Sequence, residues 1–512
     1  MVIGKFVTST NETIEVLGNC ECISRNSKEN SVCYGGLYNM SDEKFRNLHL
    51  SNSARIIEKP PGPRSRELLA KQDHAESAAV SYPKAIPVAF KEGKGATLKD
   101  VDGNIYIDFF AGAGVVNIGH CNPEVVEAAR EQMGILTHNL DFPTPIRMEL
   151  VDELLSVLPA KLKDIAKLLF VAPTGSDAVE SAMKLAKFNT GRVGMLSFEG
   201  AYHGMTAGAI TLTANKALKQ SLMPMIPEVH FVPYAYCYRC PFGGEYPDCS
   251  LECARFIEHV LDDPKSGIVD PAGIIIEAVQ GEGGSLPAPD EFLREVKRIS
   301  SEYCVPLIVD EIQAGMCRTG RMWACEHSGI TPDIMTISKG IGGGLPLSAL
   351  VFDEKLDTWE KGAHVGTFRG NVVAVAAGVA TLRFIKEHKL WKHAAKLGEE
   401  VFIPRLRELQ EESRFIGETR GKGLMLGIEF VKDKDSKKPW TEFAKEIRKA
   451  CYQRGLIVEI GGHFSNVVRF MPPLVLTKEL AEAGLEIFTD SLREVEKASQ
   501  TAEFATVSSH LS

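Results

Sequence analysis

The stretch DIMTISKGIGGGLPLSALVF, residues 333–352, sets the fold class of this chain. Two short, largely apolar runs, residues 333–338 and 347–352, flank Lys339 and three consecutive glycines. Such runs are typical of strands that are buried on both faces of a parallel sheet. A lysine at the end of a strand is most often a solvated surface group, so its role depends on what the other strand ends carry.

Similar runs recur along the chain and alternate with helical patterns. Apolar runs cover residues 168–174, 193–198, 273–279 and 305–311, and residues 177–189 and 289–303 repeat apolar side chains at the helical spacing of three and four. Strands that alternate with amphipathic helices predict an α/β domain built on a mostly parallel sheet. From about residue 375 the pattern changes to long helices and then strand-like segments, which predicts a second, smaller α+β domain.

These patterns also predict the domain boundaries. The first residues are polar and rich in Ser and Asn, and a Pro/Gly-rich linker follows them near residue 58. The predicted parts are a poorly ordered arm over 1–57, the N-terminal part of the small domain over 58–110, the large domain over 111–372, the C-terminal part of the small domain over 373–498 and a tail over 499–512.

Residues with chemical functions follow several predicted strands. In open α/β sheets, ligands bind at the carboxyl ends of the strands. Gly175 and Ser176 open a helix there and can offer N–H groups and a hydroxyl to a phosphate, although an ordinary helix cap has the same pattern. The other strands are followed by flat rings, polar groups and an amine, namely Tyr202, His203, Asp310, Gln313 and Lys339. Together these groups predict a site for pyridoxal 5′-phosphate, held by the lysine as a Schiff base.

Composition and charge exclude other classes of protein. The 512 residues carry a net charge of −9, whereas a nucleic-acid-binding protein would show a basic face. No apolar run approaches the roughly 18 residues of a membrane span, and the N-terminus lacks the pattern of a signal peptide. The chain has 12 cysteines, which we expect to be free thiols in a reducing cytoplasm rather than a disulfide framework.

Four of these cysteines are clustered, at Cys237, Cys240, Cys249 and Cys253. Two pairs with this spacing could bring four thiols to one zinc ion. The pairs are closer together than in common zinc ribbons, and buried cysteines also pack as small apolar side chains. We therefore assign no metal ligand from the sequence and leave zinc binding as an open alternative.

The order and spacing of the motifs resemble those of a known family. Residues 85–495 resemble the class III, fold-type I, pyridoxal-phosphate-dependent aminotransferases. The resemblance is carried by TGSDAVESAMKLA (174–186), AYHGMT (201–206), EAVQGEGG (277–284), VDEIQAGMCRTG (309–320), SKGIGGGLPLSA (338–349), GTFRGN (366–371) and RGKGLMLGIEF (420–430). Ala278 stands where a proline is common, and Met316-Cys317 replaces a common Phe-Gly, but neither departure affects a group with a chemical role.

The resemblance implies roles for the residues around the cofactor ring. Lys339 would carry the cofactor as a Schiff base and then move the proton during the reaction. Asp310 would pair with the pyridine nitrogen, and Gln313 would reach the ring hydroxyl. Tyr202 would stack on the ring with His203 beside it.

The resemblance also implies how the phosphate is bound. Gly175 and Ser176 would hold the phosphate within one subunit. Thr367 resembles a residue that reaches the phosphate of the neighbouring subunit. The family likeness therefore implies a homodimer with the site at its interface, alone or within a tetramer.

Three further residues resemble substrate-binding positions. Arg420 resembles an arginine that binds the α-carboxylate of glutamate, and Glu282 an acid that can pair with that arginine and release it. Met205 stands where relatives that act on 4-aminobutyrate or acetylornithine carry an arginine. In this feature and others the chain resembles aminotransferases that move the terminal amine of L-2,4-diaminobutyrate to 2-oxoglutarate, giving aspartate 4-semialdehyde and glutamate. Two alternatives stay open: a transaminase for another ω-amino acid, of the 4-aminobutyrate or ornithine type, and an amino-acid racemase or epimerase on the same fold.

Overall fold

The computed structural model describes the backbone of residues 2–7, 13–17 and 44–510, and the side chains of residues 44–159 and 161–500. Contacts divide the chain into two units, residues 1–43 and 44–512. In the first unit, β1 (Val2–Val7) pairs antiparallel with β2 (Thr13–Leu17). Most of the predicted arm lies outside the described residues, as do the last two residues of the predicted tail.

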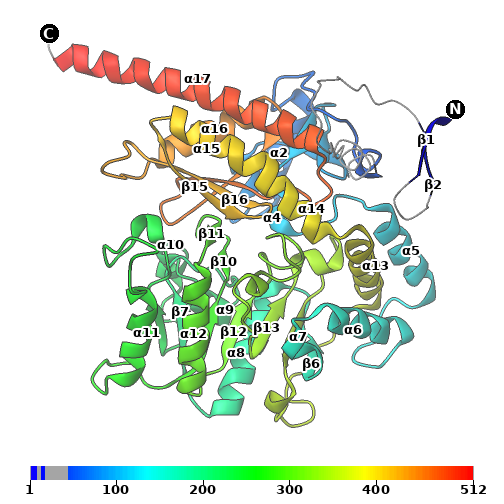
Figure 1. The fold of residues 1–512 in the computed structure, drawn as a ribbon, viewed down its shortest axis with the longest axis vertical. Helices are drawn as coiled ribbons and strands as arrows, with labels where there is room; N and C mark the ends of the chain where they lie inside the picture. Colours follow the sequence, from blue (N-terminus) through cyan, green and yellow to red (C-terminus); the bar gives the residue numbers. More distant parts are fainter. Residues whose placement is uncertain (1, 8–12, 18–43, 511–512) are drawn as a thin grey trace. The chain divides into compact units, whose positions relative to one another are not determined.

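The second unit contains a seven-stranded sheet, which occupies the lower half of Figure 1. Its strands, in spatial order, are β6 (Ala166–Phe170), β14 (Ala349–Asp353), β13 (Ile334–Ile337), β12 (Leu307–Asp310), β9 (Pro271–Ile276), β7 (Gly194–Phe198) and β8 (Val229–Val232). Only β14 runs antiparallel to its neighbours in this sheet. This arrangement confirms the predicted α/β class with a mostly parallel sheet.

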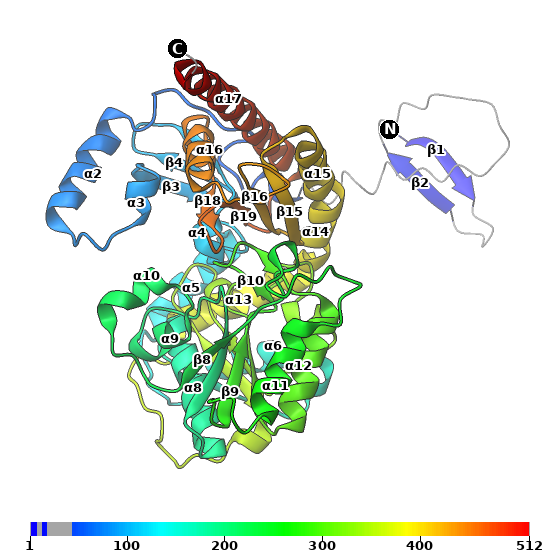
Figure 2. The same cartoon turned by 90° about the vertical axis from the view of Figure 1, so that its left-hand side faces the viewer.

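Helices cover both faces of the sheet, which explains why its inner strands are largely apolar. Alternate strand residues point to opposite faces. Ile275 and Ile308 belong to the apolar cluster that includes α8 (Gly175–Thr190), whereas Ile274 and Leu307 belong to the cluster that includes α12 (Asp290–Glu302). Figure 2 shows α8 on one side of the strands and α12 on the other.

The smaller sheets join the two ends of the second unit. An antiparallel sheet has the order β15 (Ile416–Lys422), β16 (Met425–Phe430), β19 (Val467–Phe470) and β18 (Glu459–Gly461). Another has the order β17 (Leu456–Ile457), β5 (Ile105–Asp108), β4 (Thr97–Asp100) and β3 (Phe90–Lys94). Because β17 pairs with β5, segments more than 300 residues apart share one sheet.

The remaining elements pack around these sheets. The longer helices are α2 (Pro63–Ala75), α5 (Pro123–Ile135), α6 (Pro145–Val157), α11 (Glu252–Asp262), α13 (Val372–His388), α14 (Leu390–Leu397), α15 (Ile403–Glu412), α16 (Thr441–Gln453) and α17 (Lys478–His510). The short ones are α3 (Tyr82–Ala85), α4 (Ala111–Gly114), α7 (Ala160–Lys163), α9 (Ala207–Leu212), α10 (Lys216–Lys219), η1 (Gln220–Leu222), η2 (Cys237–Arg239), η3 (Ala324–His327), η4 (Lys339–Gly342), η5 (Glu354–Leu356) and η6 (Gly398–Phe402), with the two-residue strands β10 (Val279–Gln280) and β11 (Leu286–Pro287). Over the described residues, no helix has both the length and the apolar character needed to cross a membrane.

Candidate active site

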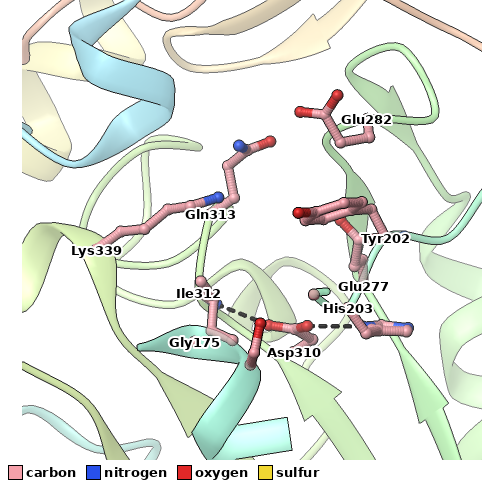
Figure 3. Close-up of a pocket in the computed structure, with 11 residues that line it drawn as sticks. Gly175, Tyr202, His203, Glu277, Glu282, Asp310, Ile312, Gln313 and Lys339 are labelled. Carbon is pink, nitrogen blue, oxygen red and sulfur yellow. Dashed lines mark hydrogen bonds and ion pairs between the residues drawn. The ribbon is translucent and has the colours of Figure 1, made fainter. Parts of the chain in front are cut away.

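One pocket lies at the carboxyl ends of the strands of the large sheet. It is lined by Gly175, Ser176, Tyr202, His203, Gly204, Glu277, Glu282, Asp310, Ile312, Gln313 and Lys339. Figure 3 shows the side chain of Lys339 extending toward Gln313, with Tyr202 and Glu282 on the opposite side. The structure thus brings together the residues predicted around the cofactor ring, the predicted phosphate-binding pair and Glu282.

Asp310, the last residue of β12, is a buried carboxylate with both oxygens engaged. One oxygen accepts the Ile312 amide at 3.0 Å and the Thr336 hydroxyl at 3.1 Å. The other lies 2.7 Å from Nδ1 of His203, which is itself buried. These partners fix the carboxylate in one orientation and leave it facing the pocket (Figure 3).

Lys339 begins η4 in a strained conformation, with φ of 47°. A non-glycine residue in this left-handed region persists only where its surroundings hold it, and such residues cluster at functional sites. The pKa of the Lys339 amine is lowered because burial disfavours the ammonium ion, although the carboxylates of Glu282, Asp310 and Glu277 oppose this effect. A lysine with a lowered pKa is a better nucleophile toward carbonyl groups.

The N-terminus of α8 forms the anion-binding end of the pocket. Thr174 caps the helix through a reciprocal capping box with Asp177, so the amides of Gly175 and Ser176 remain at the open helix end. Gly204, at φ of 124°, approaches so closely that a Cβ there would lie 2.1 Å from the Ser176 hydroxyl oxygen. The backbone of Met205 donates to this oxygen at 3.2 Å. Backbone N–H groups at a helix N-terminus are suited to binding a phosphate.

Glu277 is a pocket residue that the sequence analysis missed. Its carboxylate accepts the amides of Tyr202 at 3.1 Å and Gly281 at 2.9 Å, and so it fixes the loop that carries the Tyr202 ring. Burial raises the pKa of Glu277 to about 7, with the carboxylate of Asp310 adding to this effect and His203 opposing it. The available signal was an acid that ends the apolar run of β9, as Asp310 ends that of β12.

Two polar atoms in the pocket have no hydrogen-bond partner among the described residues. They are Oε1 of Gln313 and Nε2 of His203, and both side chains are buried. The amide nitrogen of Gln313 donates to the Ala113 carbonyl at 3.1 Å, which turns its oxygen elsewhere. Because buried polar atoms normally have partners, these two atoms indicate that a polar ligand belongs in this pocket.

The acid Glu282 pairs with an arginine that the sequence analysis did not consider. Nη1 of Arg469, on β19, lies 2.9 Å from Oε1 of Glu282. Arg469 is buried, and its Nε and Nη1 make no hydrogen bond of normal geometry with the described residues. An arginine with free N–H groups can bind a carboxylate through two parallel hydrogen bonds.

The expected pairing of Glu282 with Arg420 is corrected by the structure. Nη1 of Arg420 instead contacts Glu418 at 2.5 Å and Glu429 at 2.6 Å, and its Nε donates to the Gly284 carbonyl at 3.1 Å. Arg420 therefore belongs to a buried charge cluster behind the loop that carries Glu282. The physical reason is strand position, because β15 and β19 lie on opposite sides of β16.

Two other predicted residues do not line the pocket in this chain. The side chain of Met205 is half exposed, and its backbone lies at the Ser176 end rather than beside Glu282. Thr367 is exposed and lines a separate hollow with Leu140, Asp141, Phe142, Pro143, Val365 and Gly366.

The four clustered cysteines line one small cavity together. Burial, reinforced by the neighbouring thiols, raises the pKa of Cys237 to about 11. Burial likewise raises the pKa of Cys253 to about 12. Within the described part of the chain, no group of three or more His, Cys, Asp and Glu side chains is arranged to hold a metal ion.

Comparisons with known proteins place the chain in one family. The family model for class-III aminotransferases matches residues 78–492. A diaminobutyrate–2-oxoglutarate aminotransferase of Rhizobium meliloti is 45% identical over 80% of this chain and 88% of its own. An alanine/serine racemase of Pyrococcus horikoshii is 36% identical over 86% of this chain and 93% of its own. The crystal structure of an amine transaminase from an uncultivated Pseudomonas species, in its PLP-bound form, has a TM-score of 0.76 at 26% identity, covering 82% of this chain and 98% of that one.

Proposed function

Because the chain belongs to the class-III aminotransferases, we propose that it moves the terminal amino group of L-2,4-diaminobutyrate to 2-oxoglutarate. The products would be aspartate 4-semialdehyde and glutamate. The observation that carries the proposal is the Arg469–Glu282 pair beside Lys339, because it lets one pocket accept substrates of different charge. The Rhizobium relative, which is named for this reaction, supports the choice of donor.

The pocket residues fit pyridoxal phosphate as the cofactor. Lys339 would supply the amine, Asp310 would pair with the ring nitrogen, and the α8 amides with Ser176 would hold the phosphate. The unpartnered Oε1 of Gln313 could accept a bond from the ring hydroxyl. When bound, this cofactor supplies a carbonyl that takes up the amino group and a ring that accepts the electron pair left after proton loss.

The chain's own residues would then transfer the proton of the substrate carbon and hold the cofactor ring. Lys339, once free, can accept the proton from the substrate carbon on its neutral Nζ, because burial favours the uncharged amine. Asp310, which His203 and Thr336 hold in one orientation, would accept a hydrogen bond from a protonated ring nitrogen. Tyr202 presents its ring to the pocket on a loop that Glu277 fixes.

Arg469 and Glu282 would control the carboxylate position of the pocket, which a substrate carboxylate can occupy in place of Glu282. 2-Oxoglutarate and glutamate bring a carboxylate that can replace Glu282 on Arg469. In the absence of such a carboxylate, the buried arginine stays paired with Glu282, which avoids an uncompensated buried charge. Glu282 can move away at low cost because its side chain is 39% exposed.

We propose further that the enzyme is a homodimer whose subunits complete each other's sites. Thr367 lies outside the pocket of its own chain, beside exposed apolar side chains. Val365 and Phe142 are 77% and 70% exposed, which is unusual for large apolar residues unless another surface covers them. The nine cysteines that the structure describes are all free thiols, which supports a cytoplasmic location.

A racemase is the second candidate, because the Pyrococcus racemase is also similar over most of its length. An amino-donor screen with 2-oxoglutarate, read as glutamate formed, tests the proposal. We expect 2,4-diaminobutyrate to be the best donor, ahead of ornithine and 4-aminobutyrate. Loss of optical activity from a single amino acid, without any glutamate formed, would establish the racemase instead.

A further inference from the structure

Glu459, on β18, is a buried carboxylate with one oxygen unused. The residue is 8% exposed. Its Oε1 contacts Nη1 of Arg448 at 2.8 Å and accepts the Ile460 amide at 2.8 Å. Its Oε2 is buried and has no hydrogen-bond partner among the described residues. Buried carboxylate oxygens normally have partners, so this atom indicates an acceptor position for a ligand.

The sheet places this carboxylate on the same face as the carboxylate-binding arginine. Glu459 and Arg469 are directly opposite each other in the antiparallel β18–β19 pair, so both side chains project from one face. Gly461 lies on the same face, and a Cβ there would approach Nε of Arg469 to 2.6 Å. The absence of a side chain at Gly461 gives the arginine room beside Glu459.

Glu459, Arg469 and Glu282 form a row of charged side chains that extends toward Lys339. Arg469 contacts Glu282, which lines the pocket with Lys339. Tyr82 lies within electrostatic reach of the whole row: burial and the carboxylates of Glu282 and Glu459 raise the pKa of its hydroxyl, while Arg469 lowers it. An acid and an arginine therefore stand next to each other on the side of the pocket away from the phosphate end.

The chemistry of a diamino acid matches this pair. The α-carbon of 2,4-diaminobutyrate carries a carboxylate and an ammonium group when its terminal amine is the one that reacts. An arginine next to an acid complements such a zwitterion, because each charge meets its opposite. Arg448 and Glu282 already balance Glu459 and Arg469, so binding a zwitterion adds no net charge to the buried row.

We propose that Glu459 binds the α-ammonium group of a diamino acid donor through its free Oε2, while Arg469 binds the α-carboxylate of the same molecule. This inference rests on the proposed function and names the residue that selects its donor. Glutamate has no second ammonium group, since its only amine is at the reacting carbon. Glu459 therefore contributes to the diamine half of the reaction and not to the glutamate half.

The test uses full-length, cofactor-loaded enzyme and the variant Glu459→Gln. With 2,4-diaminobutyrate as donor, we expect kcat/KM to fall about 10- to 100-fold, as for loss of one charge-assisted hydrogen bond. In a single-turnover reaction with glutamate alone, the second-order rate constant should change by less than about twofold. Glu459→Asp, which keeps the charge, should recover part of the diaminobutyrate rate.

Two control variants separate binding from a structural role. Glu446→Gln removes an exposed carboxylate that pairs with Lys449 at 3.2 Å on α16, and it should change neither rate. Arg448→Gln removes the cation that holds Oε1 of Glu459 but leaves the carboxylate in place, so the diaminobutyrate rate should fall less than in Glu459→Gln. If Glu459 only anchors Arg448, Glu459→Gln and Arg448→Gln would lose the same activity.

The outcomes distinguish this inference from the proposed function. A wild-type enzyme that uses no diamino acid overturns both. A wild type that uses 2,4-diaminobutyrate overturns the inference alone if Glu459→Gln keeps that rate. The inference also fails if the variant loses the diaminobutyrate and glutamate reactions equally, or if Arg448→Gln reproduces its profile.

Discussion

Arg469 and Arg420 are both buried arginines on strands of the small antiparallel sheet. We nevertheless expect their substitution to have different effects on catalysis and on stability. Arg469→Met removes the group proposed to bind the carboxylate, so KM for 2-oxoglutarate should rise about 10- to 100-fold. Stability should change little, because its partner Glu282 is 39% exposed and can be solvated. Steady-state kinetics and urea unfolding together measure both effects.

Arg420→Met should have the opposite effect: it should lower stability and leave KM for 2-oxoglutarate nearly unchanged. It leaves the fully buried carboxylate of Glu429 without one of its partners, and breaking a buried pair costs about 3–5 kcal/mol of unfolding free energy. KM for 2-oxoglutarate in the folded fraction should stay close to that of the wild type. If Arg420→Met instead raised KM and left stability unchanged, the assignment of the two arginines would have to be exchanged.

At the residue scale, the sequence predicts the residues around Lys339 but not which arginine pairs with Glu282. Asp310, Lys339 and Gly175 each lie at or just after the carboxyl end of a strand of the large sheet, so their common position is a consequence of parallel topology that the sequence reveals. Which arginine meets Glu282 depends on strand order in a different sheet. Arg469 lies in the apolar run VVRF, which reads only as a strand.

At the scale of elements, the segment from residue 44 to 57 is packed, although the sequence places it in the arm. Phe45 is 1% exposed and contacts the rings of Phe384 and His393. His49 accepts the Ala96 amide on Nδ1 at 2.9 Å, and the segment thereby joins the sheet that contains β4. The sequence analysis missed these few anchoring contacts because the composition around them is polar and rich in Ser and Asn.

The attachment of this segment should weaken in acid. Burial lowers the pKa of His49 to about 4, whereas a free histidine titrates near 6.5. The unfolded segment therefore binds a proton that the folded one excludes, and stability is lost as the pH falls from about 6.5 to 4. By pH 5 the loss is about 2 kcal/mol, or roughly 30-fold in local opening.

Hydrogen exchange of peptides from residues 44–57, corrected for intrinsic rates, measures this opening at pH 7 and pH 5. His49→Asn keeps an acceptor near the position of Nδ1 but cannot titrate, so its protection should not change between the two pH values. His74→Asn, at an exposed position, should behave like the wild type. Equal acid sensitivity in the His49 variant would contradict this account.

The five inner strands of the large sheet were predictable because each is buried on both faces, whereas the two edge strands are only partly buried. The runs that contain β7, β9, β12, β13 and β14 were all predicted, with ends that differ by a few residues. The edge strand β8, with the sequence VHFV, is only partly buried and was missed. One-sided burial permits His230 in the strand, and this breaks the apolar run.

At the scale of the whole molecule, an apolar patch formed by Leu140, Phe142, Val365 and Phe368 lies on the surface around the hollow that contains Thr367. The dimer proposal requires this patch to be covered. Light scattering of the wild type should give twice the chain mass of 56.1 kDa. The double variant Phe142→Asp, Val365→Asp should shift the protein to monomers and lower its activity, because like charges and lost burial oppose association. Val269→Asp changes a residue that is also more than half exposed but lies elsewhere, and it should stay dimeric.

Complementation between two impaired variants tests whether the subunits share their sites. Lys339→Ala removes the proposed cofactor-binding amine, and Thr367→Ala removes a hydroxyl proposed to act on the neighbouring subunit. In a mixed dimer, the site with an intact Lys339 receives an intact Thr367 from the other chain. After unfolding and joint refolding, half of the dimers should be mixed, each with one complete site, so about a quarter of the wild-type activity should return. Assays at limiting cofactor concentration make the loss in Thr367→Ala measurable. If Thr367 acted within its own chain, no site in the mixed dimer would be complete, and the mixture would show only the sum of the two separate variants.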